Sequence, residues 1–148
     1  MDSRARSLLR RSMVVRIATR SPKGSPQIMP LWFGTHRGRI CMNTAETSPT
    51  VRNIATNPEV VLLFDGGQRR AATVLRIRGT AQFRRDRGFR ALMGLKVWSR
   101  YYLSPAALIK VARNLRRLPA MATYYQERGA HAGVIEVIPE SFELVRSP

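Results

Sequence analysis

The residues of this chain that could do chemistry are few. Its 148 residues include nine acids, two histidines and one cysteine. His36 and His131 have no spacing that indicates a shared metal, and we expect both to be solvated surface residues. Cys41 lies in a short predicted strand as a small core residue, and a single cysteine forms neither an internal disulfide nor a thiolate metal cluster. If the protein catalyses a reaction, we expect a cofactor to carry it.

The strongest local signal for a ligand is the segment 43–53, which reads Asn-Thr-Ala-Glu-Thr-Ser-Pro-Thr-Val-Arg-Asn. In this segment a predicted strand delivers hydroxyl residues to a helix N-terminus, where unpaired backbone N–H groups and the helix dipole favour a phosphate. Arg52 would add a bidentate charged contact. The spacing alone also fits plain N-capping by Ser48 with Pro49 in the first helical position, and it favours that simpler interpretation.

The elements that must position these residues are mostly strands. Short β-branched runs separated by Gly, Pro and Asn turns predict one compact antiparallel β-barrel of about six strands. In the long strand 72–84, Val74, Arg76 and Arg78 share one face, and Gly79 indicates a bulge or a close approach of another backbone or a ligand. Helices are expected at 3–10 and 50–56 and a hairpin turn at 36–39. The expected strands cover 13–19, 27–35, 40–44, 59–65, 72–84, 133–138 and 142–145.

The character of the chain changes at Asp86, where apolar residues recur at helical spacing. We expect one domain over 1–148 with a helical insert at 86–129, including helices near 105–118 and 121–128. The first of these two helices, 105–118, carries a basic face flanked by tyrosines, which is typical of a nucleic-acid contact. A solvated face is the more common role for such a helix, and a lid over a bound cofactor is a third interpretation. The basic face consists of Lys110, Arg113, Arg116 and Arg117, and the tyrosines are Tyr101, Tyr102, Tyr124 and Tyr125.

The net charge of +17 is large for this length. It should attract anions, so ligands with phosphate or carboxylate groups gain encounter rate and affinity. It also predicts salt-sensitive, non-specific binding to nucleic acid. No apolar run is long enough to span a membrane, and the basic N-terminus lacks the apolar region of a secretory signal, so we expect a cytoplasmic protein.

Three stretches of the sequence resemble the flavin-binding split barrels related to pyridoxamine 5'-phosphate oxidase. They are Gly24-Ser-Pro-Gln-Ile-Met-Pro-Leu-Trp-Phe33, the run Ser48-Pro-Thr-Val-Arg-Asn-Ile54 between Thr44 and Asn57-Pro58, and Arg76-Ile-Arg-Gly-Thr-Ala81. Together these motifs are moderately specific, although each alone is weak. The resemblance covers roughly the first half of the chain and recurs at the final strands, whereas the insert is less typical.

The resemblance implies a homodimeric, mainly β, split-barrel fold that binds FMN, with the deazaflavin coenzyme F(420) as the alternative because the superfamily includes both branches. Some members of the superfamily also bind haem or related tetrapyrroles. Thr50 stands where many relatives place a phosphate-binding lysine, so Arg52 or Arg78 would have to compensate. The flavin ring would lie along one strand close to Met42 and Asn43. The implied cofactor-binding residues are Pro30, Leu31, Trp32, Asn43, Thr44, Ser48, Thr50, Arg52 and Arg78.

These observations predict an FMN- or F(420)-dependent oxidoreductase that transfers a hydride between the cofactor and a small organic substrate. The alternative is a non-enzymatic module that binds a cofactor or associates with nucleic acid through its basic surface. No residue of the chain is indicated as a general acid or base.

Overall fold

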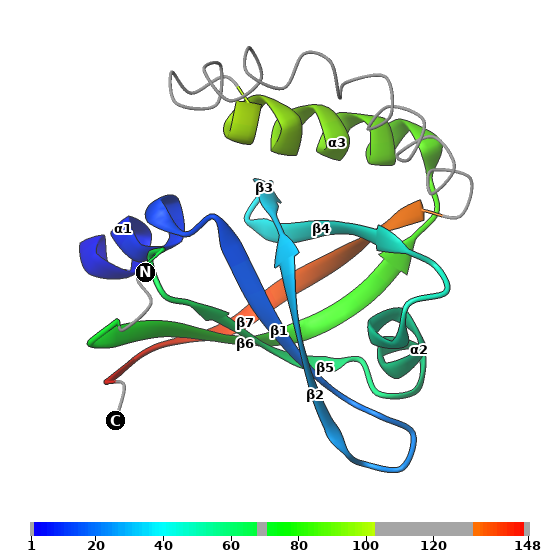
Figure 1. Ribbon diagram of the computed structural model, residues 1–148, viewed down its shortest axis with the longest axis horizontal. Coiled ribbons are helices and arrows are strands. Elements are labelled where there is room, and N and C mark those ends of the chain that lie inside the picture. The colour runs from blue at the N-terminus through cyan, green and yellow to red at the C-terminus, as the bar shows by residue number, and fades with distance from the viewer. Residues whose placement is uncertain (1, 68–70, 103–131, 147–148) are drawn as a thin grey trace, which may run out of the picture.

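The structure is a computed structural model that describes residues 2–67, 71–102 and 132–146. All its strands belong to one antiparallel sheet of order β2-β1-β5-β6-β7-β4-β3 (Figure 1). None of the described helices is long and apolar enough to cross a membrane. The elements are α1 (Ser3–Arg11), β1 (Val14–Arg20), β2 (Pro26–Trp32), β3 (Gly34–His36), β4 (Arg39–Ala45), α2 (Pro49–Thr56), β5 (Glu59–Phe64), β6 (Thr73–Arg84), α3 (Arg87–Tyr102) and β7 (Ala132–Arg146).

The two edges of this sheet are consecutive pieces of one strand. β2 ends at Trp32 and β3 begins at Gly34, so the chain bends at Phe33 as it passes from one edge to the other. The Phe33 side chain is fully buried, which anchors the bend in the core. Because β2 also contacts β4, the sheet curls into a barrel that closes through this bent strand. The predicted antiparallel split barrel is confirmed, and the expected single strand 27–35 is divided at the bend.

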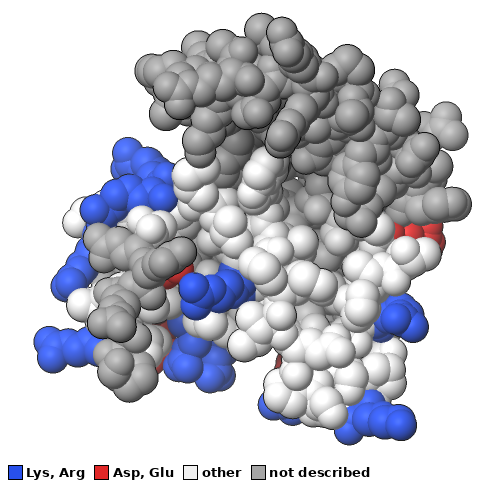
Figure 2. Space-filling view, viewed as in Figure 1, with Lys and Arg blue, Asp and Glu red and all other residues white. Residues whose placement is uncertain are grey.

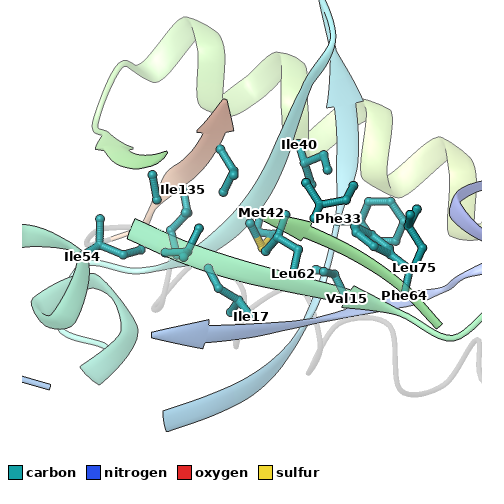
Figure 3. Packing of buried hydrophobic residues seen from close by; sticks show 14 of the residues in the cluster. Val15, Ile17, Phe33, Ile40, Met42, Ile54, Leu62, Phe64, Leu75 and Ile135 are labelled. Atoms are coloured by element: carbon teal, nitrogen blue, oxygen red, sulfur yellow. The ribbon is translucent and has the colours of Figure 1, made fainter. Parts of the chain in front are cut away.

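The barrel is filled by the alternate side chains that its strands turn inward. In β6, Leu75 and Ile77 are buried in the core, while Val74, Arg76 and Arg78 lie on the outer face, as the sequence predicted. Figure 3 shows these inward side chains packed together, with the rings of Phe33 and Phe64 edge to face at 5.0 Å between centroids. The strongly alternating strands therefore specify which residues can reach a ligand on the outside.

The helices cover different parts of the barrel. α1 and α2 lie toward opposite ends of it (Figure 1), and each buries two apolar side chains in the core. α3 lies instead across the outer face, against β3, β4 and β7. Its contact forms a second, smaller apolar cluster. The core residues of α1 and α2 are Ala5, Leu8, Val51 and Ile54, and the second cluster contains Cys41, Met93, Val134 and Phe89.

The last two expected strands are one continuous strand, β7. Its register with β6 shifts between Arg78 and Gly79, where Gly79 pairs with Pro139. Proline cannot donate to a ladder but is tolerated at a bulge, so Pro139 marks the irregularity without ending the strand. The bulge predicted at Gly79 is confirmed. The expected helices 105–118 and 121–128, the tyrosines at 124 and 125, and His131 lie outside the described residues.

Candidate functional site

The segment predicted to hold a phosphate forms the turn from β4 into α2. The side-chain oxygen of Ser48 accepts a hydrogen bond from the backbone N–H of Val51 at 3.3 Å, and Pro49 occupies the first turn of the helix. The backbone N–H of Ser48 donates to the carbonyl of Ala45 at 3.0 Å, which tightens the turn. Ser48 is thus the N-cap of α2, which accounts for its presence independently of any ligand.

The structure brings some of the predicted phosphate residues together. Thr44 and Ser48 are half-buried on either side of the turn, and Arg52 is exposed on α2. Thr50 is buried on the face of α2 that packs against the barrel, so its hydroxyl is not open to a ligand in this conformation. Arg78 is exposed on the outer face of β6, where it pairs with Val61 of β5. Arg52 is therefore the exposed cation carried by α2.

The residues predicted to line a flavin ring flank the point where β2 separates from β4. Trp32 ends β2 with 43% of its surface exposed, Pro30 is also exposed, and Leu31 points inward beside the core. The β3–β4 ladder pairs Gly34 with Cys41. Trp32 pairs with Val14 of β1, at the other edge of the sheet, whereas Asn43 of β4 pairs with Val134 of β7. The β3–β4 ladder itself stops at Gly34, so the two side chains stand on either side of the split.

The side chain of Asn43 carries a buried hydrogen-bond acceptor that no described donor reaches. It is half-buried on β4, and its side-chain Oδ1 is buried with no hydrogen-bond partner among the described residues. Leaving a buried acceptor unpaired costs about 1–3 kcal/mol. Few such groups exist in folded proteins, and each calls for an explanation; Nε of Arg76 is the other one among the described residues. Met42, by contrast, points into the barrel core and is fully buried, so it faces away from this site.

The buried carboxylate of Glu136, which sequence reasoning did not single out, organises the outer face beneath α3. It accepts hydrogen bonds from Gln82 at 2.8 Å and from Arg84 at 3.1 Å, and it pairs with Arg39. Burial by itself raises the pKa of Glu136, but the hydrogen bonds from its partners outweigh that effect and leave the pKa below its ordinary value. The signal available in the sequence was one acid within the apolar run 133–138.

The same network fixes α3 against the barrel. The Arg84 guanidinium lies 3.9 Å from the centroid of the Phe89 ring, and that ring packs edge to face on His36 at 5.7 Å. Nδ1 of His36 lies 2.9 Å from Nζ of Lys96. His36 is partly exposed at the surface, and its ring also contacts Phe89 and Lys96 of α3. Burial, followed by the charges of Lys96 and Arg37, lowers the pKa of His36.

Cys41 is inert in this environment. Burial, followed by the charge of Glu136, raises its pKa to about 11, so the thiol stays protonated at neutral pH. The expectation of a small core residue at this position is confirmed. The described residues also contain no group of His, Cys, Asp or Glu side chains arranged to hold a metal ion.

A model of the pyridoxamine 5'-phosphate oxidase family matches residues 1–127. The chain belongs to this family. No curated protein sequence matches the chain. The predicted family resemblance is thereby confirmed, and the match covers all but the last two residues of the expected insert but ends before the final strands.

Solved structures share the family fold with this member. An F(420) reductase is 23% identical with a TM-score of 0.68, and the match covers 97% of this chain and 98% of that one. A conserved hypothetical protein from Mycobacterium tuberculosis is 18% identical with a TM-score of 0.72, covering 99% and 85%. The heme storage protein HutZ from Vibrio cholerae is 12% identical with a TM-score of 0.60, covering 98% and 93%. At these identities the likeness establishes the fold.

Some members of the pyridoxamine 5'-phosphate oxidase family bind FMN or F(420), and the residues of this chain fit such a group in part. Asn43 supplies an unpaired amide, Trp32 supplies an exposed aromatic surface, and Arg52 supplies an exposed cation near a helix N-terminus. Thr50 does not contribute a second cation at the position where many relatives carry lysine. The fit is therefore better on the ring side than on the phosphate side.

Proposed function

We propose that this protein is an oxidoreductase that binds FMN or coenzyme F(420) and transfers a hydride between that cofactor and a small organic substrate. The observation that carries the proposal is the unpartnered side-chain oxygen of Asn43 on β4, together with exposed Trp32 on the contacting strand β2, in a chain of this family. Binding to the protein would position the cofactor, which itself supplies the hydride chemistry.

In this proposal the start of α2 receives the cofactor's phosphate. Arg52 provides the charged hydrogen bonds, with Thr44 and Ser48 at the turn, and the helix dipole adds to the attraction. Because Thr50 is buried, Arg52 is the group on α2 that takes over from the lysine of many relatives. Arg78 lies on a different strand and would contribute through its charge. The ring lies along the Pro30-Leu31-Trp32 stretch of β2, where the exposed Pro30 and Trp32 exclude water from one side of it.

The charge of the molecule supports an anionic ligand. The chain carries 26 basic and nine acidic residues. Figure 2 shows lysine and arginine side chains spread around the margins of one face, with few acids among them. A positive field of this kind attracts phosphate and carboxylate groups and raises their rate of encounter with the site. It supports both cofactors, since F(420) ends in an acidic tail.

We also propose that the protein is a homodimer whose second subunit completes the pocket. Among the described residues no helix covers the outer face of β2, where Ile28 is 62% and Trp32 43% exposed. Large apolar side chains grouped on one strand are typical of an interface. Sedimentation at several protein concentrations in high salt, which screens the repulsion between two basic subunits, measures the association. A monomer at all concentrations would contradict this part of the proposal.

The test of the proposal is an absorbance spectrum of the purified protein followed by fluorescence titration with FMN, F(420) and haem. We expect one FMN or F(420) per subunit and about tenfold to hundredfold weaker binding in Arg52→Ala, because a charged hydrogen bond is worth about 1.5–3 kcal/mol. Arg6→Ala removes the same charge from exposed α1, toward the other end of the barrel, and should leave the affinity within about twofold. Binding of haem alone, or of no cofactor, would refute the oxidoreductase proposal. Equal loss in both variants would show that net charge, and not Arg52, holds the cofactor.

A further inference from the structure

The side chain of Asn53 joins α2 to the β1–β2 hairpin. Asn53 lies on the face of α2 that packs against the barrel, and only 3% of its surface is exposed. Its Nδ2 atom donates hydrogen bonds to Oγ1 of Thr19 at 3.0 Å and to Oε1 of Gln27 at 2.7 Å. Thr19 of β1 and Gln27 of β2 are paired in the ladder. Both hydrogens of one amide group therefore bridge a single rung of the hairpin.

This bridge is more specific than the attachment of α2 requires. The helix already places Val51 and Ile54 in the apolar core. The carbonyl of Pro58, just beyond the helix, also accepts a hydrogen bond from the N–H of Ala81 of β6 at 2.8 Å. Apolar contacts are non-directional, so they hold a helix against a sheet without fixing how far it slides or turns. A buried polar bridge with satisfied donors specifies one arrangement.

The bridge lies between the two halves of the proposed site. Arg52, the exposed neighbour of Asn53 on α2, is proposed to hold the phosphate, and Trp32, on β2, is proposed to face the ring. β2 is an edge strand whose ladder partner is β1. α2 lies beside the closed end of this hairpin (Figure 1), and the Asn53 amide bonds to both strands. The position of α2 relative to β2 is therefore set at this amide.

We propose that Asn53 is a positioning residue, whose bridge to Thr19 and Gln27 fixes the separation between Arg52 on α2 and Trp32 on β2. The proposal rests on the proposed function, because it concerns how one cofactor reaches both halves of the site. Asn53 is buried and does not itself touch the cofactor. A ligand with two ends gains from both contacts only when their separation matches its length, so a fixed separation raises its affinity without any new contact.

The test compares the double variant Thr19→Val/Asn53→Leu, the single variant Gln27→Leu and the control Gln82→Leu with wild type. The double variant replaces both buried partners by apolar groups of similar shape, which avoids leaving an unpaired polar group in the core. Gln27 is exposed, so Gln27→Leu removes one arm of the bridge with little effect on the core. Gln82→Leu makes the same change at an exposed position of β6, where the glutamine donates to Glu136 instead.

Each protein is melted without ligand and titrated with FMN and with riboflavin, which has the same ring but no phosphate. If wild type binds F(420) and not FMN, F(420) and a form truncated before its phosphate replace this pair. We expect wild type to prefer the phosphorylated ligand by about tenfold or more, because a charged hydrogen bond holds the phosphate.

In the double variant and in Gln27→Leu this preference should fall by about fivefold or more, while the affinity for the ligand without phosphate stays within about twofold of wild type. Both variants should melt within about 4 °C of wild type. Gln82→Leu should keep the wild-type preference. A residue that only stabilised the fold would not change the ratio of the two affinities.

An unchanged preference in the double variant would overturn the inference while leaving the proposed function intact. An equal loss of affinity for both ligands would also overturn it, because Asn53 would then serve the fold and not the spacing of the site. Failure of wild type itself to bind FMN or F(420) would refute the proposed function and this positioning role with it.

Discussion

Replacing Glu136 with glutamine removes the charge at the centre of the network beneath α3. The carboxylate is 2% exposed and pairs with Arg39 and Arg84, whose side chains are 43% and 35% exposed. Removing one partner of a fully buried ion pair costs about 3–5 kcal/mol. Because both arginines can regain water here, we expect a smaller loss of about 2–3 kcal/mol in the free energy of unfolding. For a chain of this size that corresponds to a melting temperature lower by about 5–10 °C.

The effect of this substitution depends on pH in a direction that follows from the pKa of Glu136. That pKa lies below the ordinary value of 4.5 in the folded protein, because the hydrogen bonds from Gln82, Arg39 and Arg84 outweigh burial. The carboxylate therefore stabilises the fold above about pH 4.5, and this contribution is lost as the pH falls through the lower, folded value. The difference between wild type and Glu136→Gln should shrink over that acid range.

Urea unfolding followed by circular dichroism measures the difference in the free energy of unfolding between wild type and Glu136→Gln. Equal slopes of that free energy against urea concentration would indicate that the two proteins expose similar surface on unfolding. Glu143→Gln is the matched control, since Glu143 pairs with Arg76 but is 57% exposed. Exposed pairs contribute about 0–1 kcal/mol, so this control should unfold nearly like wild type. A loss below about 1 kcal/mol in Glu136→Gln at pH 7, or an equal loss in both variants, would refute the assignment of Glu136 as the centre of the network.

Two further predictions follow from buried positions. Cys41, with its pKa raised to about 11, should react with a maleimide at pH 8 only as fast as the protein unfolds, and the labelling should accelerate in urea. Rapid labelling of the native protein would contradict the burial of Cys41. Gly79→Ala should lower the free energy of unfolding by about 2–3 kcal/mol, because the new Cβ would overlap the Ile138 carbonyl and lie 2.9 Å from Cγ1 of Val137. Urea unfolding measures this loss, and Gly94→Ala, which should not destabilise, is the control.

Much of the local structure was predictable because it depends on neighbours in the sequence. The Arg37-Gly38 pair forms a two-residue hairpin turn in which both residues have positive φ, and Ser48 caps α2 ahead of Pro49. The alternation in β6 correctly separated inward from outward residues. Turn chemistry, capping and strand alternation act over a few residues, so a single chain carries enough information to predict them.

Other local patterns were misleading because distant residues decide their outcome. Pro139 was expected to separate two strands, but Gly79 on β6 leaves room for a bulge and β7 runs on. Thr50 was expected to face a phosphate, but the barrel buries its face of α2. His36 lies at the surface as expected, but its contacts with Phe89 and Lys96 of α3 could not be predicted from its neighbours in the sequence.

The sequence by itself determined the family, the β-barrel and the outward or inward direction of most strand residues. Only the tertiary structure decided that β2 contacts β4, that Gly94 of α3 lies over the Asn43 amide, and that Glu136 is paired with two arginines. These contacts join residues separated by about ten to one hundred positions in the sequence. They depend on how the sheet curls and on which strands α3 packs against. Such long-range geometry is set by the packing of the whole core, so local patterns do not specify it.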